Sequence, residues 1–142
     1  MCLHAELIEL NKQVHAAFTQ CDLRTYLQHY SNQPQFLTSD YSLVYSTEGL
    51  ANLFEQKIQD GYRNPTSNMN YAQMDDDLAY AIGDTTFEIE GKGLKLFNWL
   101  KVFERGSSGS WIIKSVFSID SRLTNSENFP NLFELYSVYE SH

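Results

Sequence analysis

The hydrophobic pattern of this 142-residue chain changes its period once, close to Asn64-Pro65. Before this point apolar residues recur every three to four positions, which is typical of amphipathic helices. After it they recur at every second position, which is typical of strands. Helices followed by a run of strands indicate an α+β fold, and the length fits a single domain. We expect that domain to span residues 1–121 and to be followed by a tail, residues 122–142, that holds at most a short helix.

Three helices are expected in the first part. The first spans roughly residues 3–20, and the second follows the N-cap Asp22, carries Tyr30 on its apolar face and ends in the 32–34 segment. The third is capped by Ser46 or Thr47 and stopped by Gly61. Two short strands, 35–38 and 42–45, are expected around a Ser39-Asp40 turn.

Four long strands are expected in the second part, at residues 67–74, 78–90, 94–104 and 110–120. The glycine-rich segments 91–93 and 106–109 are typical of hairpin turns. Gly83 interrupts the second of these strands, which predicts a bulge or a bend there.

Charge and composition exclude several classes of function. The formal net charge is −8, so the chain lacks the basic footprint that a nucleic-acid binder or a protein of anionic membrane surfaces needs. Its two cysteines do not make a disulfide framework, which fits a reducing compartment. There is no signal peptide and no apolar run of membrane-spanning length, so we expect a cytoplasmic protein.

Three segments carry a resemblance to a known superfamily. Asp22 to Leu27 together with Tyr30 matches a "small-D-h-x-x-h…Y" helix, Asp77 to Gly83 matches a "d-x-A-x-x-x-G" strand, and Gly109 to Ile113 matches a closing "G-x-W-x-I" strand. In this order the segments resemble the nuclear transport factor 2-like superfamily, and within it the SnoaL-like proteins. The likeness covers roughly residues 5–120.

The resemblance implies a fold more than a chemistry. It implies a cone, in which a curved antiparallel sheet wraps around three N-terminal helices, with an apolar pocket at the open end. It also implies frequent dimerisation through the outer sheet face. The superfamily contains ketosteroid isomerases, polyketide cyclases, dehydratases, epoxide hydrolases, kinase association domains and transport adaptors, so the fold alone selects no reaction.

Two residues are candidates for catalysis if the chain resembles the isomerases. Those relatives keep a carboxylate base on the first short strand, near Ser39 here, and the nearest carboxylate is Asp40, one position further on. The alternative for Asp40 is a turn residue bonded to its own backbone. His15 flanks the apolar stripe of the first helix and suits acid–base work, with a boundary histidine satisfied by water or backbone as the alternative.

Aromatic residues are the candidates for a pocket lining. Tyr26, Tyr30 and Tyr45 project toward the interior of the cone or its mouth if the helices dock as in relatives, and otherwise fill the core. Trp99 and Phe117 are the candidates from the strands. In a strict alternation, Phe117 shares its face with Trp111 and Ile113.

Both faces of the last two strands are rather apolar, whereas a sheet with one wet face alternates more cleanly. This pattern predicts a homodimer through the outer sheet face. We expect no metal, because the run Asp75 to Asp77 lacks the glycine and the distal glutamate of a calcium loop, and no other cofactor.

Two functions remain open. The first is a pocket for a small, largely apolar molecule, such as a polyketide-like or steroid-like ring, with or without cofactor-independent isomerisation, cyclisation or dehydration. The second is a non-catalytic association module.

Overall fold

The computed structural model describes residues 2–39 and 42–121 of the chain. Within these ranges it contains three helices and six strands. In chain order they are α1 (Leu3–Thr19), α2 (Leu23–Gln28), β1 (Tyr30–Leu37), β2 (Leu43–Val44), α3 (Thr47–Gln59), β3 (Tyr62–Asp75), β4 (Leu78–Ile89), β5 (Gly93–Arg105) and β6 (Trp111–Asp120).

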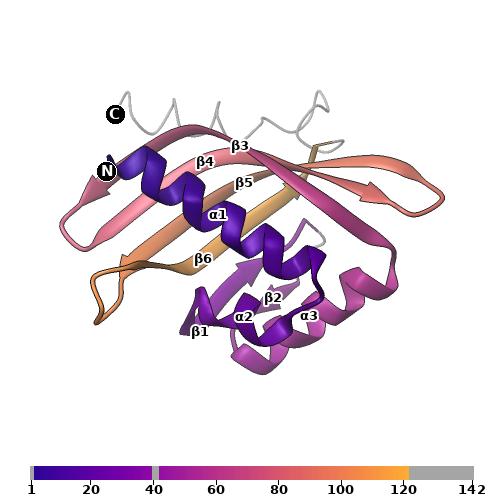
Figure 1. Cartoon of the computed structure of the whole chain (residues 1–142), viewed down its shortest axis with the longest axis horizontal. Coiled ribbons are helices and arrows are strands. Elements are labelled where there is room, and N and C mark those ends of the chain that lie inside the picture. Colours follow the sequence, from indigo (N-terminus) through magenta and orange to yellow (C-terminus); the bar gives the residue numbers. More distant parts are fainter. Residues whose placement is uncertain (1, 40–41, 122–142) are drawn as a thin grey trace.

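The six strands form one curved, unclosed sheet in the order β2-β1-β6-β5-β4-β3. Neighbouring strands are antiparallel except β1 and β6, which are parallel. Figure 1 shows α1 crossing one face of the long strands, with α2 and α3 beside β1 and β2 at one end. The expected α+β cone is therefore confirmed, with one parallel junction in a sheet that is otherwise antiparallel.

The helices begin where the sequence predicts. Asp22 caps α2 by accepting from the backbone N–H of Thr25 at 3.2 Å, and Ser46 caps α3 by accepting from that of Gly49 at 3.0 Å. The second helix is shorter than predicted, because it ends at Gln28 and Tyr30 already begins β1. Tyr30 pairs with Ile113 of β6, so a sheet contact replaces the last helical turn.

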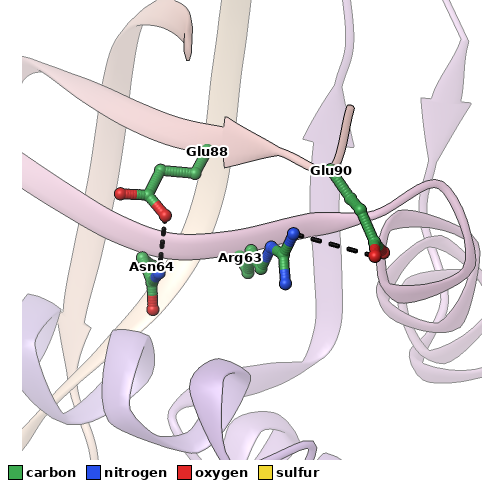
Figure 2. Close-up of polar contacts among 4 residues, drawn as sticks. All are labelled: Arg63, Asn64, Glu88 and Glu90. Atoms are coloured by element: carbon green, nitrogen blue, oxygen red, sulfur yellow. Dashed lines mark hydrogen bonds and ion pairs between the residues drawn. The ribbon is translucent and has the colours of Figure 1, made fainter. Parts of the chain in front are cut away.

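The start of β3 is irregular, and this brings a proline into the sheet. The pairing with β4 shifts between Arg63 and Thr66, and Asn64 has φ of +52°. Two polar contacts secure this end of the hairpin (Figure 2): Asn64 Nδ2 donates to Glu88 Oε2 at 2.7 Å, and Arg63 forms an ion pair with Glu90 at 3.8 Å. A proline fits such an irregular position because no ladder hydrogen bond is required of it.

Gly83 lies where the backbone of β3 and the ring of Trp99 both approach β4 closely. The register of β3 and β4 shifts between Met69 and Tyr71, so the bulge lies on β3, opposite Gly83, and not on the strand of Gly83 itself. A Cβ at position 83 would overlap the carbonyl oxygen of Asn68 and come within 2.6 Å of the Trp99 ring. The lack of a side chain at this position thus leaves room for the indole beside the strand.

A second bulge reverses the two faces of β6. Val102 pairs with Ser115 but Phe103 pairs with Ile113, which leaves Lys114 as an extra residue. Strict alternation is therefore wrong beyond Ile113. The inner face continues with Val116, Ser118 and Asp120, whose partners on β5 are Lys101, Trp99 and Phe97.

Two clusters of buried side chains fill the cone. The larger joins α1 to the sheet through residues such as Leu7, Val14, Phe103 and Ile113. The smaller lies at the other end of α1 and is formed by three phenylalanines and an isoleucine, Phe18, Phe54, Phe87 and Ile89. None of the helices in residues 2–39 and 42–121 combines the length and apolar character that crossing a bilayer requires. The expected tail, residues 122–142, lies outside the described residues.

Candidate functional site

A small cavity opens between the helices and the inner face of the sheet, where the two core clusters meet. Its volume is about 60 Å³. Val14 and Phe18 of α1 form one wall, and Phe87 and Phe97 of the sheet form another. One water molecule requires roughly 10–15 Å³ measured in this way, so the space suits a few heavy atoms rather than a four-ring skeleton.

Lys101 places an amine in this apolar space. It lies on the inner face of β5, is 6% exposed and lines the cavity. Its Nζ donates to Asn11 Oδ1 at 3.1 Å and lies 4.5 Å from the centre of the Trp99 ring. Burial, and then the positive charge of Lys57, lower the pKa of Lys101 to about 7.

Lys57 of α3 places a second amine in the lining, inside a cage of aromatic rings. Its Nζ lies 5.2–5.6 Å from the ring centres of Phe36, Tyr62, Phe87 and Phe97. Burial, and then the positive charge of Lys95, lower the pKa of Lys57 to about 8. The faces of the rings attract a cation, so the cage offsets part of the cost of removing the ammonium from water.

His15 of α1 ends a chain of hydrogen bonds along the wall. Its Nε2 lies 2.6 Å from Ser67 Oγ, Ser67 Oγ lies 2.6 Å from Thr85 Oγ1, and Trp99 Nε1 donates to Thr85 Oγ1 at 2.9 Å. If Thr85 donates to Ser67 and Ser67 to His15, every hydroxyl proton in this chain has an acceptor. That direction makes Nε2 an acceptor and leaves the ring proton on Nδ1.

The imidazole of His15 is neutral at physiological pH. Burial, and then the positive charge of Lys101, lower the pKa of His15 to about 3. The ring can thus form hydrogen bonds in the cavity, but near pH 7 it does not take up a second proton and carries no charge.

Tyr26 and Tyr30 close another side of the cavity as a bonded pair. Their hydroxyl oxygens are 3.1 Å apart, and their ring centres 5.1 Å. Burial raises the pKa of Tyr26 to about 12 and raises that of Tyr30 well above its usual range. Both phenols therefore stay protonated and serve as hydrogen-bonding groups.

Two residues predicted to line the pocket, Tyr45 and Phe117, lie elsewhere. Tyr45 is 72% exposed in the segment between β2 and α3, so its assignment to the pocket is wrong. Phe117 is also wrongly assigned, because the Lys114 bulge turns it to the outer face, where it pairs with Leu100. Asp40 lies outside the described residues. Of the predicted lining, Tyr26, Tyr30 and Trp99 surround the cavity together with His15.

Among the described residues, no carboxylate lines this cavity. Asp120 lies on the inner face of the sheet, where it pairs with Phe97, and is 3.6 Å from Lys95 Nζ. Asp120 and Lys95 line a separate, open hollow together with Tyr62. The stacked rings of Tyr62 and Phe97, with centres 6.3 Å apart, stand between the two spaces. Within residues 2–39 and 42–121, His, Cys, Asp and Glu form no group of three that could hold a metal ion.

No protein-family model matches the sequence, and no curated protein is significantly similar to it. Solved structures match its fold. A nuclear transport factor 2-like (NTF2-like) protein from Cytophaga hutchinsonii has a TM-score of 0.72 at 12% identity, over 84% of this chain and 99% of that one. A ketosteroid isomerase-like protein from Erwinia carotovora atroseptica has a TM-score of 0.68 at 14% identity, over 82% and 94%.

A third structure is called a putative calcium/calmodulin dependent protein kinase II association domain, from Xanthomonas campestris. It has a TM-score of 0.67 at 24% identity, over 81% of this chain and 85% of that one. This chain has the NTF2-like cone fold. At these identities the likeness establishes the NTF2-like fold alone, and any chemistry must be argued from the residues in the cavity.

The two lysines of this NTF2-like cavity, Lys57 and Lys101, were not predicted from the sequence. Each carried a signal. Lys101 stands between Trp99 and Phe103 on a strand face that is otherwise aromatic, and Lys57 precedes Ile58 in the buried stripe of α3. A lysine in such a position usually extends its amine to solvent, so the pattern does not distinguish a buried amine from an exposed one.

Proposed function

We propose that this chain binds a small organic acid in the inner cavity, with the acid group at the lysines and the apolar part against the rings. The observation that carries the proposal is the charge of the lining. Two lysine side chains face an aromatic space in which no described residue supplies a carboxylate. A buried positive charge without a partner is costly, and a bound anion removes that cost.

The two amines differ in how much charge they carry. At pH 7, Lys57 is mostly protonated because its pKa is about 8, whereas Lys101 is close to half protonated because its pKa is about 7. Lys57 is therefore the main anchor for an anion. Affinity should fall as the pH rises from 7 to 9, since the ammonium charge is lost over that interval.

The same geometry narrows the range of reactions open to an NTF2-like fold. An isomerase-type reaction needs a carboxylate base, whereas the titratable groups of the described lining are the neutral His15, two phenols and two amines. The small volume also favours a guest of a few atoms over a steroid-like ring. The proposal is thus for binding of a small acid, with any chemistry resting on the amines.

Titration of the intrinsic tryptophan fluorescence tests this, because Trp99 lines the cavity. The ligands are acetate, butyrate and benzoate at pH 7, each compared with its neutral amide. We expect the acids to bind more tightly than the amides, and Lys57→Met to abolish that preference. Lys12→Met changes an exposed lysine of α1 and should leave it intact. Equal affinity for acids and amides, or no saturable change at all, would contradict the proposal.

A second candidate function, association, has its own observation. The Lys114 bulge places Phe117 and Ile119 on the outer face of the sheet beside Leu100 and Val102. Exposed leucines, Leu78 and Leu94, extend this apolar face along β4 and β5. We propose that a second copy of the chain covers the face, forming a homodimer. The fold shared with a structure called an association domain supports this proposal.

A further inference from the structure

Lys101 has the surroundings of a reactive amine. Its side chain is 6% exposed, and its Nζ meets one hydrogen-bond acceptor, Asn11 Oδ1, and the face of the Trp99 ring. Neither neighbour carries a negative charge that would hold the amine in its ammonium form. An amine is nucleophilic only when it is unprotonated, and a lysine reaches that state near neutral pH when it is desolvated or next to another cation.

Lys57 lines the same cavity, with more aromatic rings around its amine than Lys101 has. Four ring faces within 5.6 Å of its Nζ stabilise the charged form. Its charge in turn disfavours a second positive charge on Lys101. The pKa of Lys57 is lowered to about 8 and that of Lys101 to about 7, so near neutral pH Lys57 carries more positive charge than Lys101 does.

We infer that Lys101 forms an imine with a small oxo acid whose carboxylate is bound by the ammonium of Lys57. This inference rests on the proposed binding of organic acids and names the substrate class of the same site. The Phe87 and Phe97 rings would contact the short carbon chain, and the oxo group would meet Lys101 Nζ.

The reaction balances without an oxidant or a reductant. The lone pair of Nζ attacks the carbonyl carbon, the carbonyl π electrons move to its oxygen, and a proton passes from nitrogen to oxygen to give a carbinolamine. Loss of the hydroxyl as water, with the second amine proton, forms the C=N bond. The products are one imine and one water molecule. In a 3-oxo acid this imine, once protonated, is an electron sink for loss of carbon dioxide.

The titratable groups around the cavity limit how pH affects this step. They are His15 from α1, Tyr26 from α2, Tyr30 from β1, Lys57 from α3 and Lys101 itself. Near neutral pH the histidine is already neutral and both phenols remain protonated. Between pH 6 and 9 the changes in charge within the described lining thus belong to the two lysines.

Reductive trapping tests the inference on the full chain. Pyruvate or acetoacetate is added with cyanoborohydride at pH 7.5, and the product is analysed by intact mass and peptide mapping. Only about a thousandth of an exposed lysine is unprotonated at that pH, whereas more than half of a lysine with a pKa of about 7 is. We expect one adduct per chain, on Lys101.

Variants separate this outcome from incidental labelling. Lys101→Met should lose the adduct and Lys12→Met should keep it. Lys57→Met should keep some reaction at Lys101 but lose the preference for pyruvate over acetone, which has no carboxylate. Butyrate, which has no oxo group, should slow trapping of the wild-type chain. Because the peptide map is made on the wild-type chain, the test remains decisive even if Lys101→Met fails to fold.

The failures of the two proposals can be told apart. Absence of an adduct, or an adduct spread over exposed lysines, overturns the imine; if carboxylates still bind better than amides, the proposed binding function stands. An adduct on Lys101 that forms equally well with acetone and pyruvate supports the nucleophile but overturns the role given to Lys57.

Discussion

The amine of Lys101 donates a hydrogen bond to Asn11 Oδ1 at 3.1 Å, which joins β5 to α1 inside the core. Among the described residues, the Nδ2 atom of the same amide has no hydrogen-bond partner. A core of this size seldom contains an amine and a half-satisfied amide side by side, because both lose their contact with water. The buried amine and the half-satisfied amide both lower the stability of the fold. Groups with perturbed pKa values of this kind are common at functional sites.

Replacing Lys101 should change how stability depends on pH. The pKa of Lys101 is about 7 in the folded chain and about 10.4 when unfolded, so the unfolded chain binds more protons between these values. The free energy of unfolding of the wild type should therefore rise with pH from 7 to 10, by about 1 kcal/mol per unit from this residue.

Lys101→Met should remove that part of the slope. Urea unfolding of both proteins at pH 7, 8 and 9 measures the difference. Lys12→Met, at an exposed position, is the matched control and should retain the wild-type slope. Parallel curves for Lys101→Met and the wild type would show that the amine is solvated in the folded state.

His15 should remain neutral well below its ordinary pKa. Its pKa is about 3 when folded and about 6.5 when unfolded, so the unfolded chain takes up more protons as the pH falls between these values. This residue should therefore cost the wild type about 1 kcal/mol of stability per pH unit below 6.5.

Two measurements check the state of His15. The ¹⁵N chemical shifts of its ring should stay those of a neutral imidazole, protonated on Nδ1, at pH 5. His15→Gln, which keeps an acceptor near Ser67, should lose less stability than the wild type between pH 6 and 4. A ring that titrates near pH 6.5 would contradict the burial and the hydrogen-bond chain described above.

Gly83→Ala should be among the most damaging small substitutions in the sheet. The added methyl would overlap the carbonyl of Asn68 and the Trp99 ring, and neither the strand backbone nor the buried indole can move away freely. Overpacking of this kind costs roughly 1–3 kcal/mol and sometimes more. Gly106→Ala is the control, since its Cβ would meet its nearest neighbour at 3.5 Å. Chemical unfolding should show a clear loss for the first variant and little change for the second.

A charge on the outer sheet face should dissociate the proposed homodimer. Leu100 and Phe117 are a cross-strand pair on that face, and an aspartate at either position would place an unpaired charge in the interface. Light scattering at micromolar concentration should show a dimer for the wild type and a monomer for Phe117→Asp. Lys114→Ser, at the exposed bulge, should remain dimeric. A monomeric wild type would end the proposal.

Local signals predicted much of the fold. Capping by Asp22 and Ser46, the hairpin glycines and the alternation of β4 and β5 all act between residues close in the chain, so the sequence records them directly.

Predictions were wrong where the pairing of one strand with another decides the structure. The extra residue at Lys114 is defined only by the pairing of β6 with β5, and it places Phe117 on the outer face of the sheet. Tyr30 belongs to β1, and not to the preceding helix, because it pairs with Ile113 of β6.

The sequence by itself therefore determined the order of the elements, their caps and turns, and the aromatic character of the interior. Only the tertiary structure decided the chemistry of the cavity. Lys57 and Lys101 lie 44 positions apart in the sequence, and nothing local to Lys101 reveals that the positive charge of Lys57 lowers its pKa. Electrostatic coupling and desolvation depend on distance in space and on the surrounding medium, and both are set when the helices close over the sheet.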